Sequence, residues 1–162
     1  MCRLRPFKTT GLSQLPWTKY GHAHMALFLA THINRIDKKG RVSVPAQFRS
    51  ALYDQAFQGV ILARSANHAC LEGFDWAYMA ELSDRLDDFD LLSPQQDDLA
   101  TAIFGDAHQI AFDGEGRIML PQDLTDYAGI VDRAAFVGLG RKFQIWNPDS
   151  LEARRGQAHH NV

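Results

Sequence analysis

The chain has 162 residues, of which 46% are hydrophobic, and its formal net charge is −2. This composition is that of an ordinary globular protein with a sizeable core, and the charge excludes a protein coated in basic residues. Two cysteines, Cys2 and Cys70, are too few and too far apart for a disulfide framework. No stretch approaches the ~20 apolar residues of a membrane-spanning helix, so we expect no membrane partner.

Residues 1–24 contain four basic side chains and no acidic one. They lack the continuous apolar segment of a targeting peptide. Met25 opens an apolar segment, residues 26–29, that has the character of a first strand. We therefore expect residues 1–24 to be either a start-site artefact or a disordered arm.

One unusual phrase occurs twice in the chain. Residues 37–45 read DKKGRVSVP and residues 113–121 read DGEGRIMLP, so Asp, Gly, Arg and Pro match in register. The match extends upstream to His32 and His108. Such agreement indicates an internal duplication. Two widely spaced copies do not make a solenoid, so a pseudo-two-fold domain, or two half-domains sharing a core, fits better.

Each copy predicts the same local structure. The Asp-x-x-Gly-Arg phrase predicts a turn, because Asp accepts from nearby amides and Gly tolerates a positive φ. Residues 31–36 and 42–44 have strand character, which predicts a β-hairpin about the first turn. The proline then ends the strand and suits the first turn of a helix. Apolar residues at helical spacing follow the first proline.

Further strands complete the two copies. Residues 59–63 and 134–138 predict one strand in each copy, and each is followed by another short apolar segment. We divide the chain into copy one, a helical linker, copy two and a C-terminal tail. These segments are residues 31–76, 77–106, 107–150 and 151–162.

The linker and tail carry helical patterns. Apolar residues recur at three- and four-residue steps from Asp75 to Ala100, with a break and a new helix start at Ser93-Pro94. These helices either cover the sheet or contact another subunit. Ser150 is a candidate cap for a short C-terminal helix from Leu151.

Charge is unevenly distributed. Residues 31–50 hold five basic side chains and one acidic, while residues 81–98 hold seven acidic and one basic. Both runs could be solvated faces. The basic run coincides with the first repeated turn, however, which favours a localised anion-binding face on a neutral body.

These features resemble the MraZ family, bacterial transcriptional regulators with two tandem AbrB-like (SpoVT-AbrB) half-domains. The resemblance rests on both turns, both prolines, Phe48-Arg49 and the closing residues 143–146, and it covers roughly residues 25–150. It implies an α+β fold, a pseudo-two-fold pair of swapped-hairpin β-barrel repeats with connecting helices. Thr125 departs from the family, which often repeats here the arginine seen at Arg49.

The resemblance also implies a function. It implies sequence-specific binding to double-stranded DNA at short direct repeats, by a ring-like homo-oligomer associated with the nucleoid in the cytoplasm. The implied target is the operon of cell-division and cell-wall genes that contains the protein's own gene.

Six basic residues are the candidate DNA contacts. Arginine reads guanine because its planar fork reaches O6 and N7 together, whereas turn lysines suit phosphates. The candidates are Arg35, Lys38, Lys39, Arg41, Arg49 and Arg117. The alternative for Arg41 and Arg117 is a pair of internal ion pairs, with Asp37 and Asp113. We favour DNA contact for Arg41, and for Arg117 both roles stay open.

Other functions find less support in the sequence. There is no Gly-x-Ser-x-Gly elbow and no phosphate-binding Gly-Lys-Ser/Thr loop, so we expect no enzyme and no cofactor. The pairs His68–Cys70 and Asp106–His108 could supply four metal ligands, but their spacing matches no known finger. The main alternative is an antitoxin-like protein-interaction module of the same fold. A small metal-dependent hydrolase is a third.

Overall fold

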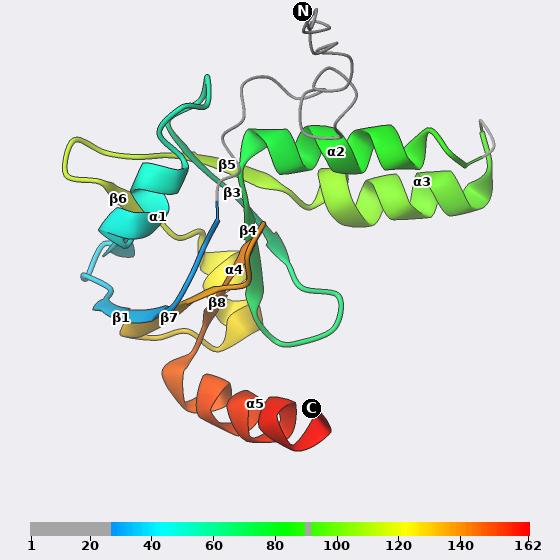
Figure 1. Ribbon diagram of the computed structural model, residues 1–162. Helices are drawn as coiled ribbons and strands as arrows, with labels where there is room; N and C mark the ends of the chain where they lie inside the picture. Colours follow the sequence, from blue (N-terminus) through cyan, green and yellow to red (C-terminus); the bar gives the residue numbers. More distant parts are fainter. Residues whose placement is uncertain (1–26, 90–91) are drawn as a thin grey trace, which may run out of the picture.

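The computed structural model describes residues 27–89 and 92–162 (Figure 1). The expectation for residues 1–24, and Asp90 of the acidic run, lie outside the described residues. The described elements, in chain order, are β1 (Thr31–Arg35), β2 (Arg41–Ser43), α1 (Ala46–Ala51), β3 (Gly59–Arg64), β4 (Leu71–Phe74), α2 (Trp76–Leu86), α3 (Pro94–Ala100), the π-helical turn η3 (Thr101–Gly105), β5 (His108–Ala111), β6 (Arg117–Met119), α4 (Gln122–Ala128), β7 (Arg133–Gly138), β8 (Phe143–Trp146) and α5 (Pro148–Asn161).

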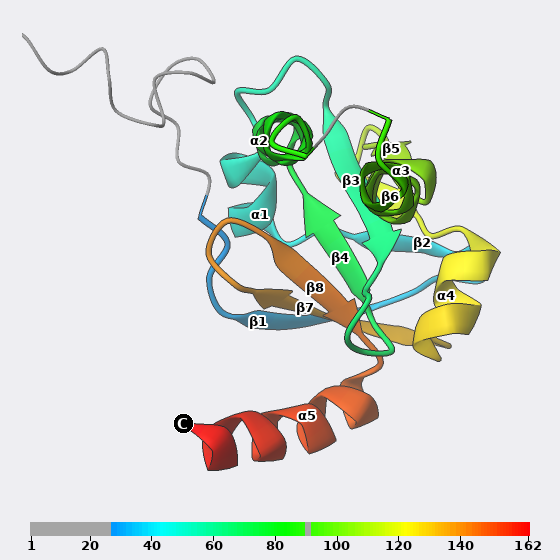
Figure 2. The same cartoon turned by 90° about the vertical axis from the view of Figure 1, so that its right-hand side faces the viewer.

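The strands form two sheets. Six of them form a sheet in the order β1-β7-β8-β4-β3-β5, and β2 pairs with β6 in a separate two-stranded ribbon. Every pairing is antiparallel. The counterparts in the two copies are β1 and β5, β3 and β7, and β4 and β8. Exchanging each strand with its counterpart gives the same six-stranded order, read from the opposite edge. Figure 2 shows β7, β8, β4 and β3 side by side, with helices on both faces.

The predicted hairpin pairing is wrong. Residues 31–36 and 42–44 do not form a ladder with each other. They are joined by one bridge, between Ile36 and Val42, and by a hydrogen bond from Asn34 Nδ2 to Ser43 O. Instead β1 pairs with β7 of copy two, and β5 pairs with β3 of copy one. The second strands, β2 and β6, pair with each other. The sequence pattern shows where strands lie but not which partner offers the larger apolar face.

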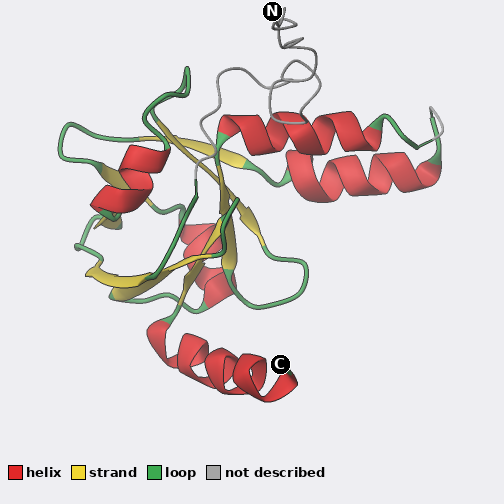
Figure 3. Cartoon of the chain, in the orientation of Figure 1, coloured by secondary structure: helices red, strands yellow, loops and turns green. Residues whose placement is uncertain are grey.

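The α+β class is confirmed, since helices accompany an antiparallel sheet (Figure 3). The closed β-barrel is not, because the six-stranded sheet runs from β1 to β5 without closing. The helix starts after both prolines and the break at Ser93-Pro94 are confirmed. Helix α5 begins at Pro148, before the predicted Leu151, because the Asn147 side chain caps it by accepting from Asp149 N.

Both copies contribute to one core. Phe48 of α1 and Leu124 of α4 are fully buried at equivalent positions. The ring of Phe48 contacts Phe28 edge-on at 5.3 Å and Phe143 at 5.2 Å, an arrangement that aromatic quadrupoles favour. Burying each such side chain contributes about 1.5–3 kcal/mol. Neither copy could exclude water from these residues alone.

Smaller clusters lie on the other face of the sheet. Met79 of α2 packs on Ile61 and Phe74, and Leu151 of α5 packs on Ala135 and Trp146. No helix within the described residues has the length and apolar character needed to cross a membrane.

The first prediction concerns Cys70, which is fully buried beneath α5. Burial raises the pKa of its thiol to about 12. The reactive thiolate is therefore scarce at pH 8, and a Cys2→Ser variant should not react with a thiol reagent such as DTNB until denaturant is added. Stoichiometric labelling of the native variant within minutes would contradict this packing.

Candidate nucleic-acid interface

The two repeated turns have the same geometry. In the first, Asp37 Oδ1 accepts from the backbone N–H of Lys39 at 3.0 Å and of Arg41 at 2.9 Å, and Asp37 Oδ2 accepts from Arg41 Nε at 2.6 Å. In the second, Asp113 accepts from Glu115 N, Arg117 N and Arg117 Nε at 2.9, 2.9 and 2.8 Å. The internal ion pairs that the sequence left open are therefore present for both arginines.

These hydrogen bonds favour the charged carboxylates. Backbone donation from Arg41 lowers the pKa of Asp37, and backbone donation from Arg117 lowers the pKa of Asp113. The pKa of Arg117 is raised, chiefly by its hydrogen bond to Asp113. Each aspartate thus fixes its turn backbone and its arginine together.

The two turns lie at opposite ends of the β2–β6 ribbon. Val42 pairs with Ile118 at its centre. Beyond the ladder, Val44 N donates to Gly116 O at 3.2 Å and Leu120 N donates to Gly40 O at 2.9 Å. Each turn is thereby fixed to the strand of the other copy, so both arginines are presented by one rigid element.

The arginines differ in their further neighbours. Arg117 Nη2 lies 3.5 Å from Glu115 Oε2, and Arg117 Nη1 lies 4.0 Å from Asp37 Oδ2. Within the described residues, Arg41 is paired with Asp37 alone, through Nε. Among the residues that the structure describes, the terminal nitrogens of Arg41 have no carboxylate partner, whereas those of Arg117 face Glu115 and Asp37.

The structure places the other candidate contacts around both turns. Arg35, at the end of β1, and Lys38 and Lys39, in the first turn, are exposed. Arg49 is half-buried and lies against the second turn, because a Cβ added at Gly116 would be 2.0 Å from Arg49 Nη1. Four of the six candidates therefore gather at the first turn, and Arg49 and Arg117 lie at the second.

Sequence reasoning missed Arg133. This exposed residue begins β7 and lies directly opposite Arg35 in the β1–β7 ladder. Because the two residues come together only through pairing between the copies, no local pattern indicates their proximity.

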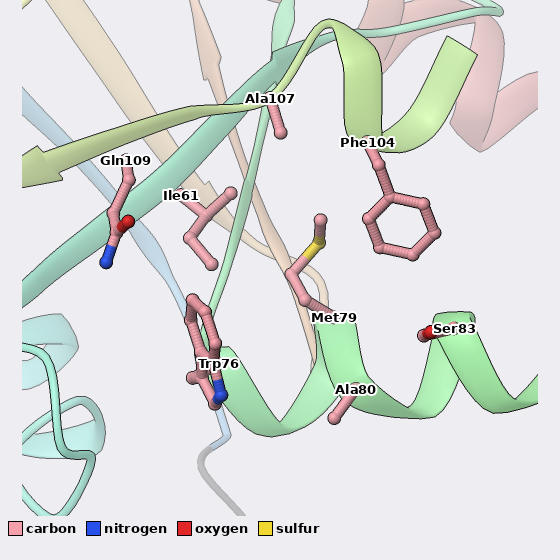
Figure 4. A pocket seen from close by; sticks show the side chains of 8 residues that line it. All are labelled: Ile61, Trp76, Met79, Ala80, Ser83, Phe104, Ala107 and Gln109. Carbon is pink, nitrogen blue, oxygen red and sulfur yellow. The ribbon is translucent and has the colours of Figure 1, made fainter. Parts of the chain in front are cut away.

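The described residues contain no group of three or more His, Cys, Asp or Glu side chains that could hold a metal ion. Asp106 forms an ion pair with Arg64, and His68 lies against the Trp146 ring. A cavity of 390 Å³ lies away from the turns, between α2, η3 and the β3–β5 pair (Figure 4). Its lining side chains are uncharged: Ile61, Trp76, Met79, Ala80, Ser83, Phe104, Ala107 and Gln109.

The fold and the paired turns define a mixed α/β protein built on a duplicated Asp-x-x-Gly-Arg element. A family model described as "MraZ protein, putative antitoxin-like" matches residues 103–159. A relative named Transcriptional regulator MraZ, from Gluconacetobacter diazotrophicus, is 49% identical over 83% of this chain and 87% of its own length. Proteins of the same name from Gluconobacter oxydans and Rickettsia canadensis are 47% and 43% identical, over 83% and 79% of this chain and 84% and 86% of their own lengths. The chain belongs to the MraZ family.

The second prediction tests the contact between Arg49 and the second turn. Gly40 and Gly116 both have a left-handed φ, of +86° and +75°, but only Gly116 lies against a side chain. Gly40→Ala should cost about 1–2 kcal/mol of unfolding free energy from strain alone. Gly116→Ala should cost more, because Arg49 must move.

Gly114→Ala is the matched control, since Gly114 has neither a left-handed φ nor a neighbour within 4 Å. Urea unfolding of the three variants gives the comparison. Equal losses for Gly40→Ala and Gly116→Ala would mean that displacing Arg49 from the turn has no measurable cost.

The third prediction concerns acid. The pKa values of Asp37 and Asp113 are lower in the folded protein than the value of about 3.9 expected in the unfolded chain. The two carboxylates therefore stabilise the fold fully above the unfolded pKa, and this stabilisation is lost as the pH falls through the folded pKa values. The stability difference between wild type and an Asp37→Asn, Asp113→Asn double variant should therefore narrow between pH 6 and pH 3. Urea unfolding across this range measures it, and a constant difference would refute the linkage.

Proposed function

We propose that the chain is a sequence-specific, DNA-binding transcriptional regulator that reads the major groove with its paired turns. The observation that carries this proposal is the β2–β6 ribbon, with a carboxylate-held arginine at each end. The relatives named as transcriptional regulators support the same function. A two-stranded β element fits the major groove, where base edges carry a readable donor and acceptor code.

Arg41 is the proposed base-reading residue. Asp37 holds Nε, which orients the guanidinium and leaves its terminal nitrogens to donate to guanine O6 and N7. Lys38 and Lys39, on the exposed side of the same turn, would bind phosphates and set the register. Arg117 has less to offer DNA, because Asp113, Glu115 and Asp37 already surround it.

The proposal includes a homo-oligomer. One chain presents one strongly basic turn, so its affinity for a single half-site is expected to be weak. Identical chains in a ring-like assembly would place several such turns on successive direct repeats, and linked contacts gain through effective concentration. We propose that these repeats lie upstream of the protein's own gene, in an operon of cell-division and cell-wall genes, and that the protein works at the nucleoid in the cytoplasm.

An antitoxin-like interaction module is the second candidate. The description of the matching family model favours it, and the acidic α2–α3 pair offers a surface for a basic protein. Binding of the purified protein alone to duplex DNA distinguishes the two functions. A DNA-binding regulator should bind in a salt-sensitive manner, because neutralised phosphates release counterions.

The fourth prediction compares Arg41→Ala with Arg117→Ala. Because both arginines hold their turns through equivalent hydrogen bonds, the structural cost of the two substitutions should be similar. Arg41→Ala should additionally lose about 1–3 kcal/mol of discrimination, the worth of one bidentate contact to a base. The measurement is fluorescence anisotropy with duplex DNA from upstream of the gene, beside a scrambled duplex, at two salt concentrations.

Equal losses from the two substitutions would refute the ranking. Equal, weak binding of the wild type to both duplexes would refute sequence-specific recognition and favour the interaction module.

A further inference from the structure

Two arginines lie side by side on the outer face of the sheet. Arg35 and Arg133 are direct partners in the antiparallel β1–β7 ladder, where opposite residues point to the same side. Both are exposed. Within the described residues, neither has a carboxylate at ion-pair distance, although Asp132 precedes Arg133 in the chain and is itself exposed.

Such a pair is unfavourable for the protein alone. Like charges directly opposite in a ladder destabilise the pairing. The Asp-Arg turns next to it show how this chain compensates arginines elsewhere, with a carboxylate on Nε. An external anion would supply at Arg35 and Arg133 the negative charge that no carboxylate among the described residues supplies.

A third arginine extends the same face. Arg133, Ala135 and Val137 alternate along β7 and therefore point to one side, the side on which Leu151 of α5 packs against Ala135. One helical turn beyond Leu151, Arg155 Nη2 donates to Thr31 Oγ1 at 2.6 Å. Helix α5 lies beside β1 and β7 at the bottom of Figure 1.

Thr31 and Arg35 are the two ends of β1, so the arginines follow one strand. At about 3.3 Å per residue, the four steps from Thr31 to Arg35 span about 13 Å. Phosphates on one DNA strand rise about 3.4 Å per nucleotide along the helix axis, so a strip of this length parallel to that axis would span about four nucleotides. Beyond Arg35 the strip continues into Lys38 and Lys39 of the first turn.

We propose that Arg35, Arg133 and Arg155 form a phosphate-binding strip that carries the backbone of duplex DNA away from the first turn along β1 and α5. The inference rests on the proposed DNA-binding function and adds Arg133 and Arg155 to its interface. The strip binds phosphates and so contributes affinity without sequence preference.

The fifth prediction uses Arg133→Gln and the double variant Arg133→Gln, Arg155→Gln. Each lost phosphate contact makes the slope of log affinity against log salt shallower by about 0.9. The loss of affinity between 50 and 200 mM salt should therefore be about 3-fold smaller for each contact removed. Native and scrambled duplexes should lose affinity by the same factor. Arg85→Gln removes a charge on α2, where Arg85 pairs with Glu81, and should change neither affinity nor slope.

Thermal unfolding separates binding from folding. Removing Arg133 relieves a like-charge pair, so Arg133→Gln should unfold at the same or a higher temperature than the wild type. Lower stability, an unchanged salt slope, a loss confined to the native duplex, or tighter binding to duplex RNA than to duplex DNA would each overturn the strip.

Heparin distinguishes failure of the strip from failure of the proposed function. If the wild type binds neither DNA duplex, the proposed function fails. The strip then still predicts that heparin raises the unfolding temperature of the wild type more than that of Arg133→Gln. Equal shifts would overturn it independently.

Discussion

The pairing of β2 with β6 is the constraint on which the rest of the structure depends. Three residues from each copy form this ribbon, and the backbone bonds of Val44 and Leu120 attach each strand end to the opposite turn. With the ribbon in place, β1 and β5 lie against β7 and β3 of the other copy, and the core side chains of both copies meet. Stability and the placement of the arginines therefore have one origin.

The duplication makes the ribbon and its two turns symmetric in backbone. The two copies differ in the charge around those turns. The turn backbones are equivalent, but Lys38-Lys39 in one stands where Gly114-Glu115 stands in the other. The helices after the prolines differ in the same way. Arg49 of α1 reaches the second turn, whereas its counterpart in copy two, Thr125 of α4, donates through Oγ1 to Gln122 O of its own helix. Copy two thus keeps the fold-determining carboxylate and arginine with less basic character around them.

Local chemistry was predictable from the sequence, and partner choice was not. The turns, the helix starts after the prolines and the Asp-Arg ion pairs depend on residues within five positions of one another, so their spacing indicates them. The exchange of β1 and β5 between copies depends on which surface buries Phe48, Phe136 and Phe143, and a linear pattern does not contain that information. Arg133 was missed for the same reason, because its neighbour Arg35 is brought to it by the exchange.

The arginines differ in whether a carboxylate is paired with them, and this difference matches the roles proposed for them. Arg41 must hold one orientation if it reads a base edge as proposed. Asp37 fixes its Nε, and the lowered pKa of Asp37 keeps that carboxylate charged. The proposed phosphate contacts at Arg35 and Arg133 need only charge, and a fixed carboxylate there would cancel the attraction for phosphate. An arginine surrounded by three carboxylates, Arg117, meets neither requirement well, although it still closes its turn. In the proposed function, recognition therefore falls on copy one, and copy two supplies the strand partners that hold copy one in place.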